Sequence, residues 1–158
     1  MLFSCQFKPV YESNNLNSKL CSIKVESERN AAPLYEIDFK NELKSILCTQ
    51  NQNNYNYLLK WKIKNSYREL IKSATNTTRR YEETIEVKFS LFIINTNTEI
   101  YTDTIESKGA YNILEDEIIS TISSKKSLES QIAILAARLT LDKINLYMIQ
   151  NEDSKLQN

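Results

Sequence analysis

Thr84–Ile93 reads TIEVKFSLFI, and its apolar and polar side chains alternate almost throughout. Period-two alternation of this kind predicts a β-strand with one buried face and one face in solvent. The next residues, Asn95–Thr98 (NTNT), predict a hairpin turn, because asparagine tolerates a positive φ. Residues 99–107 are rich in β-branched side chains and predict the returning strand of this hairpin.

Two further strands and a helix are predicted upstream of the hairpin. Residues 55–64 alternate and predict a strand with one basic face, which residues 65–74 continue less regularly. Residues 20–25 predict a short strand. Between these strands, Pro33 precedes apolar residues at spacings of three and four up to Leu47, which predicts an amphipathic helix.

A long helix is predicted near the C-terminus. Ser127 is a candidate N-cap, and the apolar stripe after it reaches about Ile149. The stripe comprises Leu128, Ile132, Leu135, Ala136, Leu139 and Leu146. Residues 108–126, which contain Gly109, predict a connection of lower order, and residues 151–158 predict a polar, disordered tail.

The predicted element order, β-α-β-β-β-α, indicates the fold class. Two amphipathic helices and a sheet with one apolar face bury one another best as a two-layer α+β sandwich, with both helices packed on a four-stranded, mostly antiparallel sheet. The length of 158 residues fits one such domain. We assign residues 1–19 to an N-terminal lead-in, residues 20–150 to the single domain and residues 151–158 to the tail.

Composition excludes most familiar catalytic sites. The absence of histidine excludes Ser-His-Asp triads, Cys-His pairs and histidine-liganded zinc. A single glycine excludes the phosphate-binding loops that need two or three. We therefore expect a protein that is not an enzyme and that uses no cofactor and no metal.

The three cysteines, Cys5, Cys21 and Cys48, lack the CxxC spacing of a thiolate metal site or a redox pair. We expect Cys21 and Cys48 to be buried as small hydrophobic residues, and whether they pair stays open. No complete secretory signal fits before Cys5, so either the protein is cytosolic or its true N-terminus lies upstream of Met1.

Charge is segregated along the chain although the net charge is zero. Residues 55–80 hold seven cations and one acid, whereas residues 81–117 hold nine acids and two lysines. Neighbouring antiparallel strands of opposite sign usually pair across their solvent face. We expect such pairs among Lys60, Lys62, Lys64, Glu86 and Lys88.

Arg79 and Arg80 are better candidates for binding an anion. We place them at the mouth of a strand-to-strand connection, where two adjacent arginines have no packing purpose and could grip a phosphate bidentately. Nucleic acid is a poorer ligand, because a neutral chain lacks the long-range field that drives such binding.

One catalytic pattern offers an alternative function. Glu86-Val87-Lys88 resembles the ExK element of carboxylate metal nucleases, in which an acid and a lysine on one strand face hold a divalent ion and activate water. Asp103 or Glu99 could supply the second acid. A cytosolic metal-dependent nuclease is therefore one alternative, and an unrelated α+β protein-binding adaptor is another.

The N-terminal residues MLFSCQFKPVY carry a family resemblance. Leu2-Phe3-Ser4-Cys5 resembles the end of a bacterial lipobox, and Phe7–Tyr11 resembles the F-x-P-[LV]-Y opening of the mature LptE family of lipopolysaccharide-assembly lipoproteins. Thr78-Arg79, the run Gly109–Asn112 and the helix predicted over 132–146 resemble later features of the same family, in the same order.

The resemblance implies a lipid-anchored protein on the periplasmic side of the Gram-negative outer membrane. Cys5 would carry the lipid, so residues 1–19 would include the anchor segment. Such a protein plugs the LptD barrel, assists that barrel's assembly and binds lipopolysaccharide during its delivery to the outer leaflet. Arg79 and Arg80 would meet the lipid phosphates, and Lys125 and Lys126 are a second candidate pair.

Overall fold

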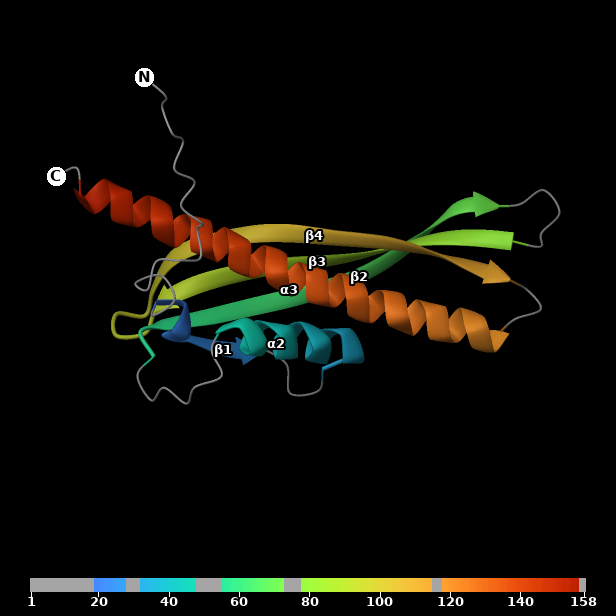
Figure 1. Ribbon diagram of the computed structural model, residues 1–158, viewed down its shortest axis with the longest axis horizontal. Coiled ribbons are helices and arrows are strands. Elements are labelled where there is room, and N and C mark those ends of the chain that lie inside the picture. The colour runs from blue at the N-terminus through green and yellow to red at the C-terminus, as the bar shows by residue number, and fades with distance from the viewer. Residues whose placement is uncertain (1–18, 28–31, 48–54, 73–77, 115–117, 157–158) are drawn as a thin grey trace, which may run out of the picture.

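The computed structural model describes residues 19–27, 32–47, 55–72, 78–114 and 118–156, which form an α+β sandwich (Figure 1). Its elements are β1 (Ile23–Ser27), α2 (Leu34–Leu47), β2 (Tyr57–Lys72), β3 (Thr78–Ile93), β4 (Thr98–Leu114) and α3 (Ile118–Leu156). This order and the two-layer packing confirm the predicted fold class.

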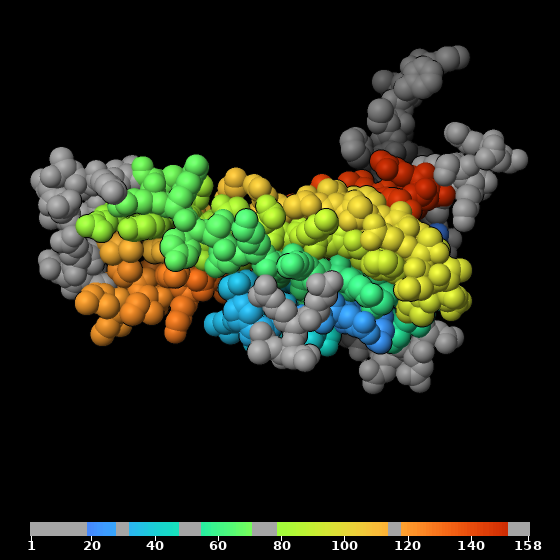
Figure 2. Space-filling model, turned by 180° about the vertical axis from the view of Figure 1, so that it is seen from behind, coloured from blue at the N-terminus to red at the C-terminus, as the bar shows by residue number. Residues whose placement is uncertain are grey.

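The strands form one sheet in the order β1-β2-β3-β4. β1 runs parallel to β2 and the other neighbours are antiparallel, so the sheet is mostly antiparallel, as predicted. The turn after β3 occupies residues 94–97, where Asn97 has a φ of 50°. Both helices lie on one face of the sheet (Figure 1), and strands form much of the surface on the opposite side (Figure 2). We call this second surface the open face.

The strands are longer than their alternation predicted. β3 begins at Thr78 and β4 continues to Leu114, so residues 108–114 belong to a strand and not to a loose connection, while β2 ends at Lys72 within its predicted continuation. The reason is ladder pairing, because nearly every residue of β3 has a backbone partner on both sides, whatever its hydrophobicity. At the other end of the chain, residues 19–21 form a helical turn and the first strand begins only at Ile23.

α3 is also longer than predicted. It begins at Ile118 instead of Ser127, and it continues to Leu156, through most of the predicted tail. Its first turns are rich in serine, which usually favours caps and turns over helix interiors. Most of these side chains are exposed, so this part of the helix is not marked by a buried apolar stripe.

The buried face of α3 differs from the predicted stripe. Leu135 and Leu146 are 47% and 56% exposed, so their placement in the stripe was wrong. Ala136 is buried as predicted, and further small side chains are buried beside it, namely Ala133, Ala137 and Thr140. Small residues allow the helix backbone to lie close to both the sheet and α2.

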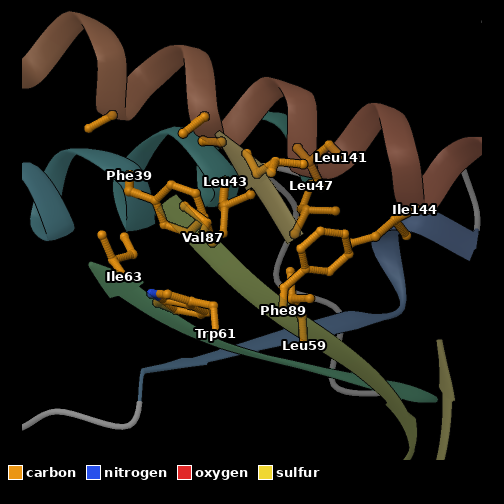
Figure 3. Close-up of a cluster of buried hydrophobic side chains, with 14 of the residues drawn as sticks. Phe39, Leu43, Leu47, Leu59, Trp61, Ile63, Val87, Phe89, Leu141 and Ile144 are labelled. Atoms are coloured by element: carbon orange, nitrogen blue, oxygen red, sulfur yellow. The ribbon is translucent and has the colours of Figure 1, made fainter. Parts of the chain in front are cut away.

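The hydrophobic core fills the half of the sheet that α2 covers (Figure 3). Phe39 of α2 and Trp61 of β2 are almost fully buried, with their ring centroids 5.6 Å apart. Further along α3, the Tyr147 ring stacks on Tyr101 of β4 at 4.5 Å, and Lys143 Nζ lies 2.5 Å from Asp103 Oδ2. These contacts fix α3 on the sheet.

Gly109, the only glycine, lies within β4 directly beneath α3. A Cβ atom there would collide with Leu128 Cδ1 and lie 3.0 Å from Ile132 Cγ2. The glycine therefore permits the close approach of α3 to this part of the sheet.

We predict that Gly109→Ala lowers the free energy of unfolding by about 1–2 kcal/mol, because the added methyl overpacks this contact. Urea denaturation measures the change. The double variant Gly109→Ala, Leu128→Ala should be more stable than the sum of the single effects predicts, since the colliding side chain is gone. Strict additivity would show that the two residues do not compete for space.

Candidate functional site

One end of the molecule lies beyond the reach of α2, and there only α3 covers the sheet (Figure 1). We call this end the tip. It comprises residues 66–72, 78–83, 109–114 and 118–129.

The tip brings together the two basic pairs predicted from distant parts of the sequence. Arg79 and Arg80 are exposed at the start of β3, where Arg79 lies opposite Ile113 in the ladder. Lys125 and Lys126 lie on α3, and Lys125 Nζ is 5.3 Å from the ring centroid of Tyr67.

The surroundings of these cations differ from the prediction. Arg79 and Arg80 lie within a strand and not on a turn, so they point to opposite faces of the sheet and cannot fork onto one phosphate together. Lys125 and Lys126 are helical and not part of a loop. Lys125 also lies 3.7 Å from Glu129 Oε1, whereas Lys126 is exposed.

Exposed apolar side chains lie at the same end of the molecule as these cations, and the sequence analysis missed them. Ile118, Ile119 and Ile122 are 70%, 86% and 51% exposed on the first turns of α3, and Tyr67 is 67% exposed on β2. The helical spacing of the isoleucines was the available signal, but the serines between them favoured a loop. The tip is therefore both cationic and apolar.

A hollow of about 680 Å³ opens beside the tip, between the end of β4 and the start of α3. Hydroxyl and amide groups dominate its lining, which includes Tyr111, Asn112, Thr121, Ser124 and Ser127. Such a lining can hydrogen-bond to hydroxyl-rich or amide-bearing ligands.

The interior beneath the tip is polar. Glu83 of β3 is fully buried, and its Oε1 accepts a hydrogen bond of 2.6 Å from Asn65 Nδ2. Burial raises the pKa of the Glu83 carboxyl, and the neighbouring Glu129 carboxyl raises it further, while Asn65 and Lys125 oppose the shift. The protonated form of Glu83 therefore favours the folded state.

The acidic residues predicted for a nuclease site do not lie together in the structure. Glu86 lies opposite Glu106 on the open face, whereas Asp103 is bound to Lys143 of α3 on the helix side. Glu99 lies several ladder rows from Glu86. Within the described ranges, no group of three or more acidic, cysteine or histidine side chains could hold a metal ion.

The predicted cross-strand charge pairs are present only in part. Lys64 lies opposite Glu86, as expected. Lys62, however, lies opposite Lys88, and Lys60 lies between Ser90 of β3 and Glu26 of β1. The register that buries the apolar face fixes these partners, so charge did not choose them.

Cys21 is half-buried and disulfide-bonded, which answers for this cysteine the question of pairing that the sequence left open. The lead-in, the lipid-anchor candidate Cys5 and also Cys48 lie outside the described residues. None of the described helices is both long enough and apolar enough to cross a membrane.

Comparisons with known proteins show a shared fold at low sequence identity. No family model and no curated protein matches the chain. Among solved structures, it is similar to a candidate lipoprotein from Caulobacter crescentus, with 16% identity, a TM-score of 0.69, and coverage of 87% of this chain and 97% of the other.

Two other solved structures are similar over most of their length. Rare lipoprotein B from Shewanella oneidensis is 14% identical with a TM-score of 0.56, covering 86% of this chain and 98% of its own. Lipoprotein B from Nitrosomonas europaea is 13% identical with a TM-score of 0.61, covering 80% and 83%. The chain thus has a fold that occurs in bacterial lipoproteins.

We predict that Glu83→Gln stabilises the protein at pH 8 by about 1 kcal/mol, because it removes a buried carboxylate with one unpaired oxygen. Since folding raises the pKa of Glu83, its protonated form favours the fold, and this stability is lost as pH rises through the raised pKa. The gain should therefore shrink toward pH 4. Urea denaturation at both pH values measures it, with the exposed Glu99→Gln as control. An equal gain at pH 4 and pH 8 would contradict the assignment.

Proposed function

We propose that the chain is a non-enzymatic, LptE-like lipoprotein of the outer membrane that binds lipopolysaccharide through its tip. The observation that carries the proposal is the meeting of exposed cations and exposed isoleucines at one end of the fold. Lipopolysaccharide presents phosphates, sugars and acyl chains close together, and the tip offers a matching group for each.

The cations would contact the phosphates. The side chains of Arg79 and Arg80 point to opposite faces of β3. Each arginine would therefore bind a different phosphate group of the lipid. Lys126 adds a third charge that has no ion-pair partner among the described residues, whereas Lys125 is already engaged by Glu129 and the Tyr67 ring. Charge-assisted hydrogen bonds to phosphate are about twice as strong as neutral ones.

The apolar and hydroxyl groups would contact the rest of the lipid. Burying an exposed isoleucine against an acyl chain is favourable by roughly 1.5–3 kcal/mol if its burial is complete. Ile118, Ile119 and Ile122 form such a surface, and the hollow beside them has the hydrogen-bonding groups that suit a sugar.

Export to the envelope is supported by the disulfide and by the fold. Disulfides persist in oxidising compartments such as the periplasm and are rare in the cytosol, so Cys21 argues against a cytosolic nuclease. The fold occurs in several bacterial lipoproteins. A lipid on Cys5 with several acyl chains would anchor the protein stably, where one chain is marginal.

The partner in this proposal is an LptD-type β-barrel, which the chain would plug and whose assembly it would assist. This part rests on the resemblance of the N-terminal motif to the LptE family. The long sheet is consistent with a plug, because three long strands packed against one helix form a rigid body that could fill a barrel.

We predict that Arg79→Glu, Arg80→Glu weakens lipopolysaccharide binding by about tenfold or more, since two attractive contacts become repulsive. Each single variant should give part of the loss, because the two side chains act on opposite faces. Titration calorimetry measures the affinity. The matched control is Lys40→Glu, Lys44→Glu on α2, which makes the same charge change far from the tip. Equal affinity for the two double variants would remove the arginines from the site.

A second variant tests the apolar part of the tip. Ile119→Ser should weaken lipopolysaccharide binding by several-fold while leaving the unfolding midpoint unchanged, because Ile119 is 86% exposed. Leu146→Ser, 56% exposed on the same helix but far from the tip, is the control. The same loss for both variants would show that exposed leucine and isoleucine act nonspecifically.

Mass spectrometry of protein isolated from membranes tests the anchor. We expect acyl chains on Cys5 and a disulfide from Cys21 to Cys48, the one cysteine then left to pair. A disulfide between Cys21 and Cys5 would contradict the lipoprotein assignment, because the anchoring thiol would be consumed.

A further inference from the structure

A like-charged pair lies at the centre of the open face, away from the tip. Lys62 of β2 faces Lys88 of β3 across the antiparallel ladder, and the next residue in that row is the neutral Thr104. Both lysines are exposed, and neither has an ion-pair partner within the described part of the chain. Like charges directly opposite one another destabilise a sheet.

The acids of the open face are mostly engaged elsewhere. Glu82 pairs with Arg68 at 3.0 Å, Glu106 pairs with Lys108 at 2.9 Å, and Glu26 pairs with Lys24 at 2.6 Å. Glu86 lies opposite Lys64 in the β2–β3 ladder. Lys60 lies opposite Glu26 in the β1–β2 ladder, whereas Lys62 and Lys88 face no acid within their own ladder row.

Lys60, Lys62 and Lys88 line a shallow hollow that also contains the ring of Phe92. The hollow is about 300 Å³ and is lined by Lys60, Trp61, Lys62, Lys88, Ser90, Phe92 and Glu99. Lys60 Nζ lies 4.9 Å from the Phe92 ring centroid. A partly buried aromatic ring among cations is a common anchor in protein interfaces.

We propose that Lys60, Lys62 and Lys88, which we call the lysine cluster, dock an acidic surface of a partner protein. The charges select an acidic partner, and Phe92 would add an apolar contact at the centre. This inference is independent of lipid binding at the tip, because the two surfaces share no residue.

A protein surface fits the lysine cluster better than a small anion does. Lysine is a flexible point charge, so three of them on an exposed sheet do not form the rigid fork that holds a single phosphate. One exposed ion pair contributes little in physiological salt. Several carboxylates on one partner can engage all three lysines at once and gain both affinity and association rate.

Nuclear magnetic resonance titration of the full chain with a hexaglutamate peptide in 0.15 M salt tests the proposal. We expect shifts of the amide resonances around the lysine cluster, and a loss of affinity of about tenfold in Lys62→Glu, Lys88→Glu. Lys40→Glu, Lys44→Glu on the opposite side should bind as the unmodified chain does. Shifts confined to the tip would overturn the proposal, and so would equal affinity of the cluster for inorganic phosphate.

The free energy of unfolding gives a second test. If the lysines stabilised the fold, replacing one of them would lower the urea unfolding midpoint and would not raise it. Lys88→Thr should raise the urea unfolding midpoint, because it removes repulsion from Lys62. Lys64→Thr is the matched control and should lower the midpoint or leave it unchanged, since Lys64 faces Glu86. A lower midpoint for Lys88→Thr than for Lys64→Thr would show that the like-charged pair carries no cost.

Discussion

The packing of α3 across three long strands is the constraint on which the rest of the structure depends. β2, β3 and β4 have 16 or 17 residues each, or about 50–55 Å of strand, and α3 has 39 residues, or about 58 Å of helix. α2 has only 14 residues, about 21 Å. One helix therefore covers the full length of the sheet and the other covers less than half of it.

This mismatch divides the molecule into two parts with different chemistry. Where α2 and α3 both cover the sheet, Phe39 and Trp61 fill an apolar core. Where α3 is alone, the interior contains Glu83 and Asn65, and the outer surface retains exposed isoleucines. The half that α2 covers thus has an apolar core, whereas the tip has a polar interior and an outer surface with exposed apolar and cationic side chains.

Sequence periodicity predicted the elements whose hydrophobic pattern is strong. The alternation in Thr84–Ile93 and the asparagines of the following turn were sufficient for the hairpin. Residues 108–114 were missed, because β4 is held there by pairing with β3 and not by its own alternation. The beginning of α3 was missed for a related reason, since a helix lying at the end of a sheet does not need a continuous apolar stripe.

The sequence predicted which residue types the candidate site contains, but not how these residues are arranged. The sequence identified Arg79, Arg80, Lys125 and Lys126 as anion-binding candidates, but their meeting at one end follows from tertiary register. The side chains of Arg79 and Arg80 point to opposite faces because they are neighbours in a strand. The sequence analysis placed them at a connection, so it did not predict this separation. The opposition of Lys62 and Lys88 likewise could not be known before the β2–β3 register was fixed.

Hydrogen–deuterium exchange of the full chain, with and without lipopolysaccharide, tests the central claim of a ligand-binding tip most directly. Protection on binding should appear in residues 78–83 and 118–129 and should be absent from α2 and β1. Protection in α2 and β1 with an unchanged tip would contradict the account.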